Sequence, residues 1–233
     1  LRSEYSASDE GRINKGAAKI LFGKVYLTKG DFQKAKDKLA EVVEHESEYG
    51  FGLHKDYHAN WLRDTEAGIE AVLYIEYKEP PFQHNGEMAL AGPKYSIPGS
   101  LGISALNEAD IPTQELYDQF DNRDLRKKTN FKTEFAHLKT GEILKSSIPL
   151  SGKFWVEGLE TGDRCDVNMH IIRYADAILM YAEALNEVGE STKALAMLNR
   201  IRERAFGDDS GNFKPMSKDE FRTAISVSYT HLR

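Results

Sequence analysis

The chain has 233 residues, of which 40% are hydrophobic and 10% aromatic, and this composition predicts a folded protein with a sizeable core, in one large domain or two small ones. Its formal net charge of −6, without a basic patch or an arginine-rich helix, disfavours nucleic acid and anionic membrane surfaces as partners. Cys165 is the only cysteine, which excludes an internal disulfide and a CxxC metal site, and no run approaches the roughly 18 apolar residues of a membrane-spanning helix.

Residues 12–46 are predicted to form a helical hairpin. A small residue, Gly23, stands where two helices would cross, Gly30 stands at the turn, and Ala35 is a second small residue opposite the first. The same spacing returns near the other end of the chain, at Ala182, Gly189 and Ala194. The sequence therefore predicts two related hairpins.

The middle of the chain, residues 51–170, has a different character and is too long for a simple loop. An apolar and β-branched run over 71–77 predicts a buried strand or an extended segment. A helix is expected over 116–120, starting at Pro112 and Thr113, and turns with short strands are expected over 130–165. Asp124 and Arg126 are expected to form an ion pair that pins a turn.

The second hairpin is predicted over residues 171–206. Ala175, Ile178, Ala182 and Leu185 recur at three- and four-residue spacing and so share one helix face. Gly189 is expected to end the first helix, and Ser191 or Thr192 to cap the next.

Residues 207–233 complete the chain as a tail. A loop over 207–212 is followed by a helix whose start carries capping-box spacing at Ser217 and Glu220.

The hairpin spacing resembles that of tetratricopeptide repeats, with Gly23, Tyr26 and the Gly30–Asp31 turn at the repeat's positions. The repeat's tryptophan position falls on Lys19 and Ile178, so two unrelated helical hairpins remain an alternative. We predict a mainly α protein: tetratricopeptide-like helical hairpins with an irregular, loop-rich, partly β insertion.

Four segments carry a further likeness: Ala17 to Phe32, Glu70 to Tyr77, Leu116 to Arg126, and Ile172 to Ala205. In this order they resemble the SusD/RagB family of outer-membrane nutrient-binding lipoproteins. The likeness covers nearly the whole chain, up to about Ile225, and its most specific part is the run from Ile172 to Ala205.

This resemblance implies a SusD-like superhelix of α-helices and a non-catalytic protein. Such a protein would bind oligosaccharide or polysaccharide at the cell surface and deliver it to a SusC-like TonB-dependent transporter. It would be held at the outer membrane by a lipid anchor in an N-terminal portion absent from this sequence. The family's lipobox is missing, and residues 226–233 depart from its pattern after Ile225, so we expect a domain incomplete at both termini.

Sugar recognition needs flat aromatic faces that stack on pyranose rings, with polar groups that reach the hydroxyls. Trp155 is the first candidate, because it stands in a glycine-punctuated loop; Trp61 and Tyr95 follow. Against each stands the ordinary interpretation that an aromatic side chain belongs to the core. We assign 51–170 as the ligand-binding insertion.

No catalytic residue, metal site or cofactor is predicted. His54 and His58 lack a third ligand, and two nearby carboxylates would raise the thiol pKa of Cys165, the wrong direction for a nucleophile. Two other functions stay open: a helical-repeat scaffold that binds protein segments, and a glycosidase with a carboxylate pair. The long aromatic and glycine-rich insertion disfavours the scaffold.

Overall fold

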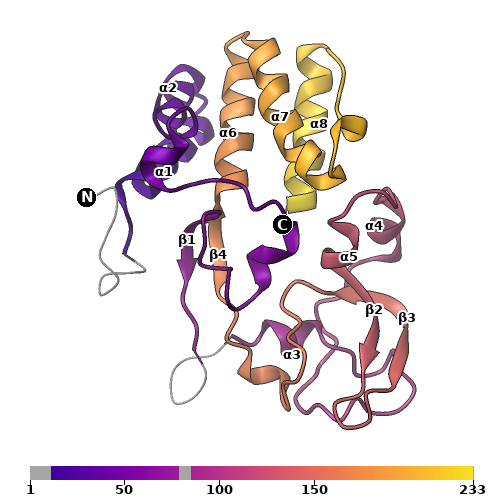
Figure 1. Cartoon of the computed structure of the whole chain (residues 1–233). Coiled ribbons are helices and arrows are strands. Elements are labelled where there is room, and N and C mark those ends of the chain that lie inside the picture. The colour runs from indigo at the N-terminus through magenta and orange to yellow at the C-terminus, as the bar shows by residue number, and fades with distance from the viewer. Residues whose placement is uncertain (1–11, 79–84, 233) are drawn as a thin grey trace. The chain divides into compact units, whose positions relative to one another are not determined.

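The computed structural model describes residues 12–78 and 85–232, with side chains described up to Tyr229. Helices dominate and strands are few, so the predicted mainly α, partly β fold is confirmed. The helices are α1 (Lys15–Thr28), α2 (Phe32–Val43), α3 (Glu87–Ala91), α4 (Gln114–Gln119), α5 (Lys127–Asn130), α6 (Tyr174–Glu187), α7 (Ser191–Phe206) and α8 (Lys218–Leu232). The strands are β1 (Ala71–Ile75), β2 (Phe131–Ala136), β3 (Ile143–Ser151) and β4 (Met169–Arg173) (Figure 1).

The chain divides into two compact units. A helical unit comprises the described parts of residues 1–56, 67–75 and 170–233, and a loop-rich unit comprises those of 57–66 and 76–169. The strand predicted over 71–77 is β1; it pairs with β4 and lies with the helices rather than with the loops. No helix within the described ranges is long and apolar enough to cross a membrane.

The first hairpin of the helical unit is formed by α1 and α2. A Cβ atom on Gly23 would lie 2.4 Å from Cγ of Leu39, so only glycine allows the two helices to approach this closely. Gly30 takes φ +75° in the turn between them, a conformation that L side chains rarely adopt. The predicted hairpin and the roles of both glycines are confirmed.

The second hairpin is formed by α6 and α7, and α8 lies beside both helices (Figure 1). The predicted face of α6 is fully buried, and Gly189 takes φ +89° in the turn that follows. The prediction that Ser191 or Thr192 caps α7 is wrong. The Glu190 N–H donates to the carbonyl of Leu185, which carries the turn directly into the helix, so Glu190 takes the cap position and Ser191 is already helical.

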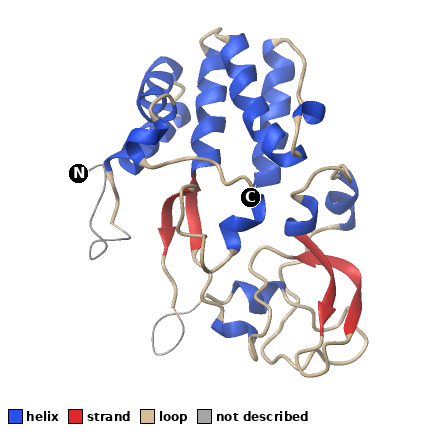
Figure 2. Ribbon diagram, in the orientation of Figure 1, coloured by secondary structure: helices blue, strands red, loops and turns tan. Residues whose placement is uncertain are grey.

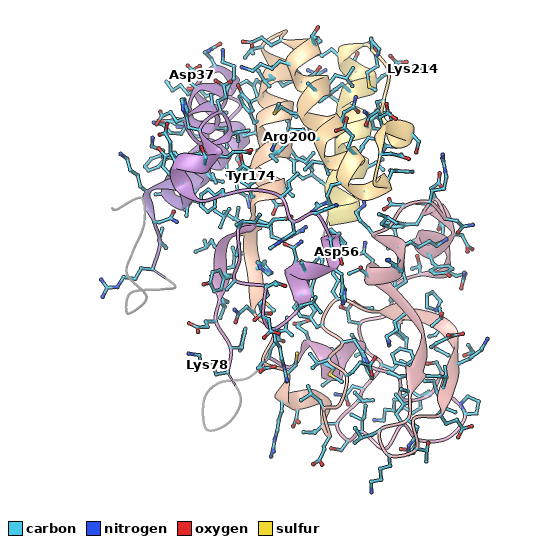
Figure 3. The ribbon with its side chains drawn as sticks, in the orientation of Figure 1. Asp37, Asp56, Lys78, Tyr174, Arg200 and Lys214 are labelled. Carbon is cyan, nitrogen blue, oxygen red and sulfur yellow. The ribbon has the colours of Figure 1, made fainter. Side chains whose placement is uncertain are left out.

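Polar contacts join these helices at their edges. Tyr174 Oη donates to Glu46 Oε2 at 2.7 Å, and Arg200 Nη2 lies 2.9 Å from the same oxygen; Figure 3 labels the tyrosine and the arginine on α6 and α7.

At the start of α8, the Ser217 and Glu220 side chains each accept the other residue's backbone N–H, which confirms the predicted capping box.

The loop-rich unit consists mostly of loops and turns around the antiparallel pair β2 and β3 (Figure 2). Its short helix α4 begins after Thr113, whose side chain accepts the Leu116 N–H, as predicted. The predicted ion pair is also present: Arg126 Nη2 lies 2.6 Å from Asp124 Oδ2, and both side chains are buried. This pair fixes the turn that leads into α5.

Candidate functional site

A pocket of about 560 Å³ in the loop-rich unit brings two of the predicted site residues together. Three stretches of chain line it: residues 58–65, the region from α5 into the start of β2, and the turn after β3. Trp61 comes from the first stretch and Trp155 from the third. The pocket therefore combines aromatic surface with several charged side chains, which are Arg63, Asp64, Lys128, Lys132 and Glu157.

Trp155 owes its position to the tight turn that follows β3. The Gly152 N–H donates to the carbonyl of Asn130 at 3.0 Å, and the Trp155 N–H donates to the carbonyl of Gly152 at 3.2 Å. A Cβ atom on Gly152 would lie 2.6 Å from the carbonyl oxygen of Thr129. The turn needs glycine because two stretches of backbone approach each other here.

The indole of Trp155 is half-buried. Its ring meets the Phe135 ring edge-on, with centroids 4.7 Å apart, and Lys132 Nζ lies 5.9 Å from its centroid. Within the described part of the chain, its buried Nε1 has no hydrogen-bond partner. An indole held by a second ring and still lining a pocket has the properties of a stacking platform.

Trp61 lies at the end of a short 3₁₀ helix, Tyr57–Trp61, and only 5% of its surface is exposed. The Trp61 ring packs on the Tyr57 ring, with centroids 4.7 Å apart. Lys153 Nζ lies 5.2 Å from the centroid of the Trp61 ring. Trp61 thus serves mainly as a wall of the pocket, and the core interpretation describes it better than it describes Trp155.

Tyr95 does not line this pocket. Its side chain is 76% exposed, and Lys94 Nζ lies 5.2 Å from its ring. The surrounding loop is held by Glu108, whose Oε2 accepts the backbone N–H groups of residues 94–96 at 2.6 to 3.0 Å. The structure therefore groups Trp61 with Trp155 and leaves Tyr95 apart from them.

The stretch 58–65 is anchored by a buried acid and by an ion pair. Glu66 Oε2 accepts the Asn168 N–H at 2.9 Å, and Arg63 Nε lies 2.6 Å from Asp166 Oδ1. Burial raises the pKa of Glu66 to about 7, the nearby Asp166 adds to this, and the Asn168 N–H and Arg63 act against it. The carboxyl that holds this wall therefore titrates near neutral pH.

A second hollow of about 390 Å³ adjoins the first and shares Lys128 and Lys132 with it. Lys127 also lines it, with Nζ 4.4 Å from the Tyr117 centroid. The sequence predicted none of these lysines as site residues. The Lys127–Lys128 pair was the available signal, and only the fold shows that it lies beside an aromatic pocket.

The helical unit has a hollow of its own, of about 630 Å³, lined by residues of α1, β4, α6 and α8. Among the described residues that line it, the aromatic ones are His170 and Tyr229, and the Tyr229 Oη donates to Glu183 at 3.2 Å. No predicted site residue lines it. The pocket with the two tryptophans is therefore the candidate site.

The side chains considered for covalent or metal chemistry are Cys165 and the two histidines at 54 and 58. Burial, with a smaller contribution from Asp166, raises the thiol pKa of Cys165 to about 11, which agrees in direction with the sequence prediction. His54 uses its backbone N–H to bind Glu70 at 3.1 Å. Among the described residues, no three His, Cys, Asp or Glu side chains are grouped as metal ligands would be.

The sequence of this chain is similar to those of known proteins. Residues 147–227 match the SusD family. The chain is 29% identical, over 91% of its length, to SusD-like protein P2 of Formosa agariphila, and it spans 46% of that protein. It thus covers about half the length of the curated relatives it matches.

Solved structures show the same fold. A SusD superfamily protein of Parabacteroides distasonis superposes with a TM-score of 0.81 at 23% identity, over 95% of this chain and 50% of that one. Surface glycan-binding protein A of Bacteroides thetaiotaomicron, in complex with laminarihexaose, superposes with a TM-score of 0.74 at 18% identity, over 97% of this chain and 55% of that one.

Proposed function

We propose that this chain, whose residues 147–227 match the SusD family, binds oligosaccharide or polysaccharide at the cell surface without catalysing a reaction on it. The observation that carries this proposal is the pocket in which Trp61 and Trp155, from separate stretches of the loop-rich unit, line one hollow. Stacked rings and convergent polar groups are what recognition of a sugar requires.

The different roles of the two tryptophans in the pocket follow from how far each side chain is buried. Trp155 offers the ring face, since its other contacts leave it half-exposed, and Trp61 forms a wall behind it. Ammonium groups of Lys128 and Lys132 donate to sugar hydroxyls, and the carboxylates of Asp64 and Glu157 accept from them. Binding by stacking and hydrogen bonds needs no covalent step.

The cellular setting of the proposal comes from the family. We infer that the protein is a surface-exposed lipoprotein of the outer membrane, attached through an N-terminal lipid anchor, and that it passes glycan to a SusC-like TonB-dependent transporter. Capture without hydrolysis suits such a role, because the transporter then receives an intact oligosaccharide. A pull-down of the transporter from outer membranes tests this partner.

Affinity electrophoresis and calorimetry against a panel of polysaccharides, with laminarihexaose included, test glycan binding. Trp155→Ala should abolish binding while its melting curve stays cooperative, and Tyr95→Ala is the matched aromatic control that should bind normally. A reducing-end assay should detect no hydrolysis. A well-folded protein that binds no glycan would return weight to the helical-repeat scaffold, and released reducing ends would revive the glycosidase.

A further inference from the structure

We propose that the glycan bound in the tryptophan pocket is anionic and carries carboxylate or sulfate groups that pair with Lys128 and Lys132. This inference rests on the proposed function, since it names the class of glycan taken by the same site. The charges that the fold gathers around the two adjoining hollows support it.

The ammonium group of Lys128 is the main support for an anionic ligand. It is exposed, it lines both hollows, and among the residues that the structure describes its ammonium group has neither a hydrogen-bond nor an ion-pair partner. An exposed lysine without a partner is common on a protein surface. This one stands at the junction of two hollows, beside the aromatic side chains that would hold a sugar ring.

Lys132 is the second cation shared by the hollows. Its Nζ lies 3.0 Å from Glu157 Oε1, and the Glu157 side chain is 59% exposed. The Lys132 side chain is 27% exposed, so the carboxylate is the more exposed partner of a surface pair that contributes little to stability, and a ligand anion can take its place at small cost. The same ammonium lies 5.4 Å from the Phe135 centroid, which keeps it beside the Trp155 platform.

Of the four acidic side chains that line the hollows, Glu157 is the partner of Lys132, and Asp124 and Glu134 pair with other cations. Asp124 is buried against Arg126, and Glu134 lies 3.2 Å from Lys145. Asp64 is the exception: it is exposed, lines the tryptophan pocket and has no ion-pair partner within the described ranges. Its negative charge would repel an anionic ligand, so removing that charge should strengthen binding if the ligand is anionic.

Lys127 extends the cationic surface into the second hollow. Its Nζ donates to the carbonyl of Phe120 at 3.1 Å and to Asn122 Oδ1 at 2.8 Å, both of which are neutral acceptors. The acid near it, Asp121, is paired with Arg123. A glycan with charged groups along its length can therefore stack on Trp155 and reach two or three ammonium groups. The formal net charge of −6 makes this cationic surface a local feature.

Matched pairs of ligands test the inference. The purified protein is titrated with polygalacturonate oligosaccharides and with the same oligosaccharides after carboxyl reduction, then with dextran sulfate and with dextran. Tighter binding of one charged member identifies carboxylate or sulfate as the recognised group. Raising the salt from about 0.05 M to about 0.5 M should weaken binding of the charged member and leave the neutral member unchanged.

Three variants, each of which removes one charge, test the sign of the charge that the ligand carries. Lys128→Gln should weaken binding of the charged ligand about three- to fivefold, Asp64→Asn should strengthen it, and Lys139→Gln, an equal loss of charge in the β2–β3 turn, should leave it unchanged. Tighter binding of the neutral members, with Lys128→Gln without effect and Trp155→Ala still abolishing binding, would overturn the charge inference and leave glycan binding intact. Failure of every ligand to bind the folded protein would overturn both.

Discussion

The side chain of Leu39 occupies the space that a Cβ atom on Gly23 would need, 2.4 Å from Leu39 Cγ. Leu39 is fully buried on α2, and Gly23 faces it from α1. The close approach of these two helices therefore depends on the absence of one methyl group.

Gly23→Ala should destabilise the protein by about 1–3 kcal/mol, because the new methyl group forces Leu39 or the helix backbone to move. Lys24→Ala, at the next and exposed position of the same helix, should change the free energy of unfolding by no more than about 0.5 kcal/mol. Denaturant unfolding of both variants measures the difference. Equal stabilities would mean that the hairpin relaxes freely around the added methyl.

Glu70→Gln should cost about 3–5 kcal/mol, because two buried guanidinium groups would lose their counter-charge. Arg173 Nη1 and Arg204 Nη1 lie 3.2 and 2.9 Å from the Glu70 carboxylate. Burial acts to raise the pKa of Glu70, but the two arginines and the His54 N–H outweigh it and hold the pKa below its ordinary value. The acid is therefore ionised at neutral pH.

The control for Glu70 is a carboxylate–arginine pair on the surface. Asp121→Asn removes one partner of Arg123, whose side chain is 64% exposed, and should lower the melting temperature far less than Glu70→Gln. Similar losses in the two variants would contradict a special role for the buried cluster.

Glu66→Gln should remove a pH dependence of stability. The folded-state pKa of about 7 lies above the ordinary value of 4.5, so the folded protein holds this proton more tightly than the unfolded chain does. Its contribution to stability is full below the unfolded pKa and is lost as the pH rises through about 7, by at most about 3 kcal/mol. The stability of the variant relative to the parent should therefore increase between pH 5 and pH 8. A constant difference across this range would contradict the raised pKa.

Cys165 should resist alkylation in the native protein at pH 7. It is fully buried and its thiol pKa is raised to about 11, so very little thiolate forms and a reagent has no access to it. Iodoacetamide labelling followed by mass spectrometry should detect modification only after unfolding. Since this is the only cysteine, any label on the native protein would show that the loop-rich unit opens locally.

Tyr95→Ala should leave both the melting temperature and glycan binding unchanged. The side chain is 76% exposed and lies outside the lining of the tryptophan pocket, so its removal takes away neither core packing nor a platform. Lost binding would mean that the ligand reaches beyond the pocket to this loop.

The sequence predicted the helical parts well because the determinants of helical hairpins are local. Gly30 and Gly189 must take positive φ, and small residues must stand where helices cross, whatever surrounds them. The cap of α7 was the local error. Ser191 and Thr192 have the right side chains, but the turn enters the helix one residue earlier than the side chains indicate.

The candidate site could be predicted only in part. The glycine-punctuated loop pointed to Trp155 first, and Trp61 and Tyr95 were ranked below it without a distinction between them. Which of these residues share a pocket depends on where the loops of the loop-rich unit meet, and the spacing of residues in the sequence does not predict that.

The sequence by itself determined the class of fold, the two helical hairpins and the resemblance to one family, because spacing, turn glycines and motif order are properties of neighbouring residues. Only the tertiary structure decided that Trp61 and Trp155 line one pocket, that Lys128 and Lys132 stand beside them, and that Glu70 joins two arginines from distant segments. The physical reason is that burial, pairing and charge depend on contacts between residues far apart in the chain, and these exist only once the chain has folded.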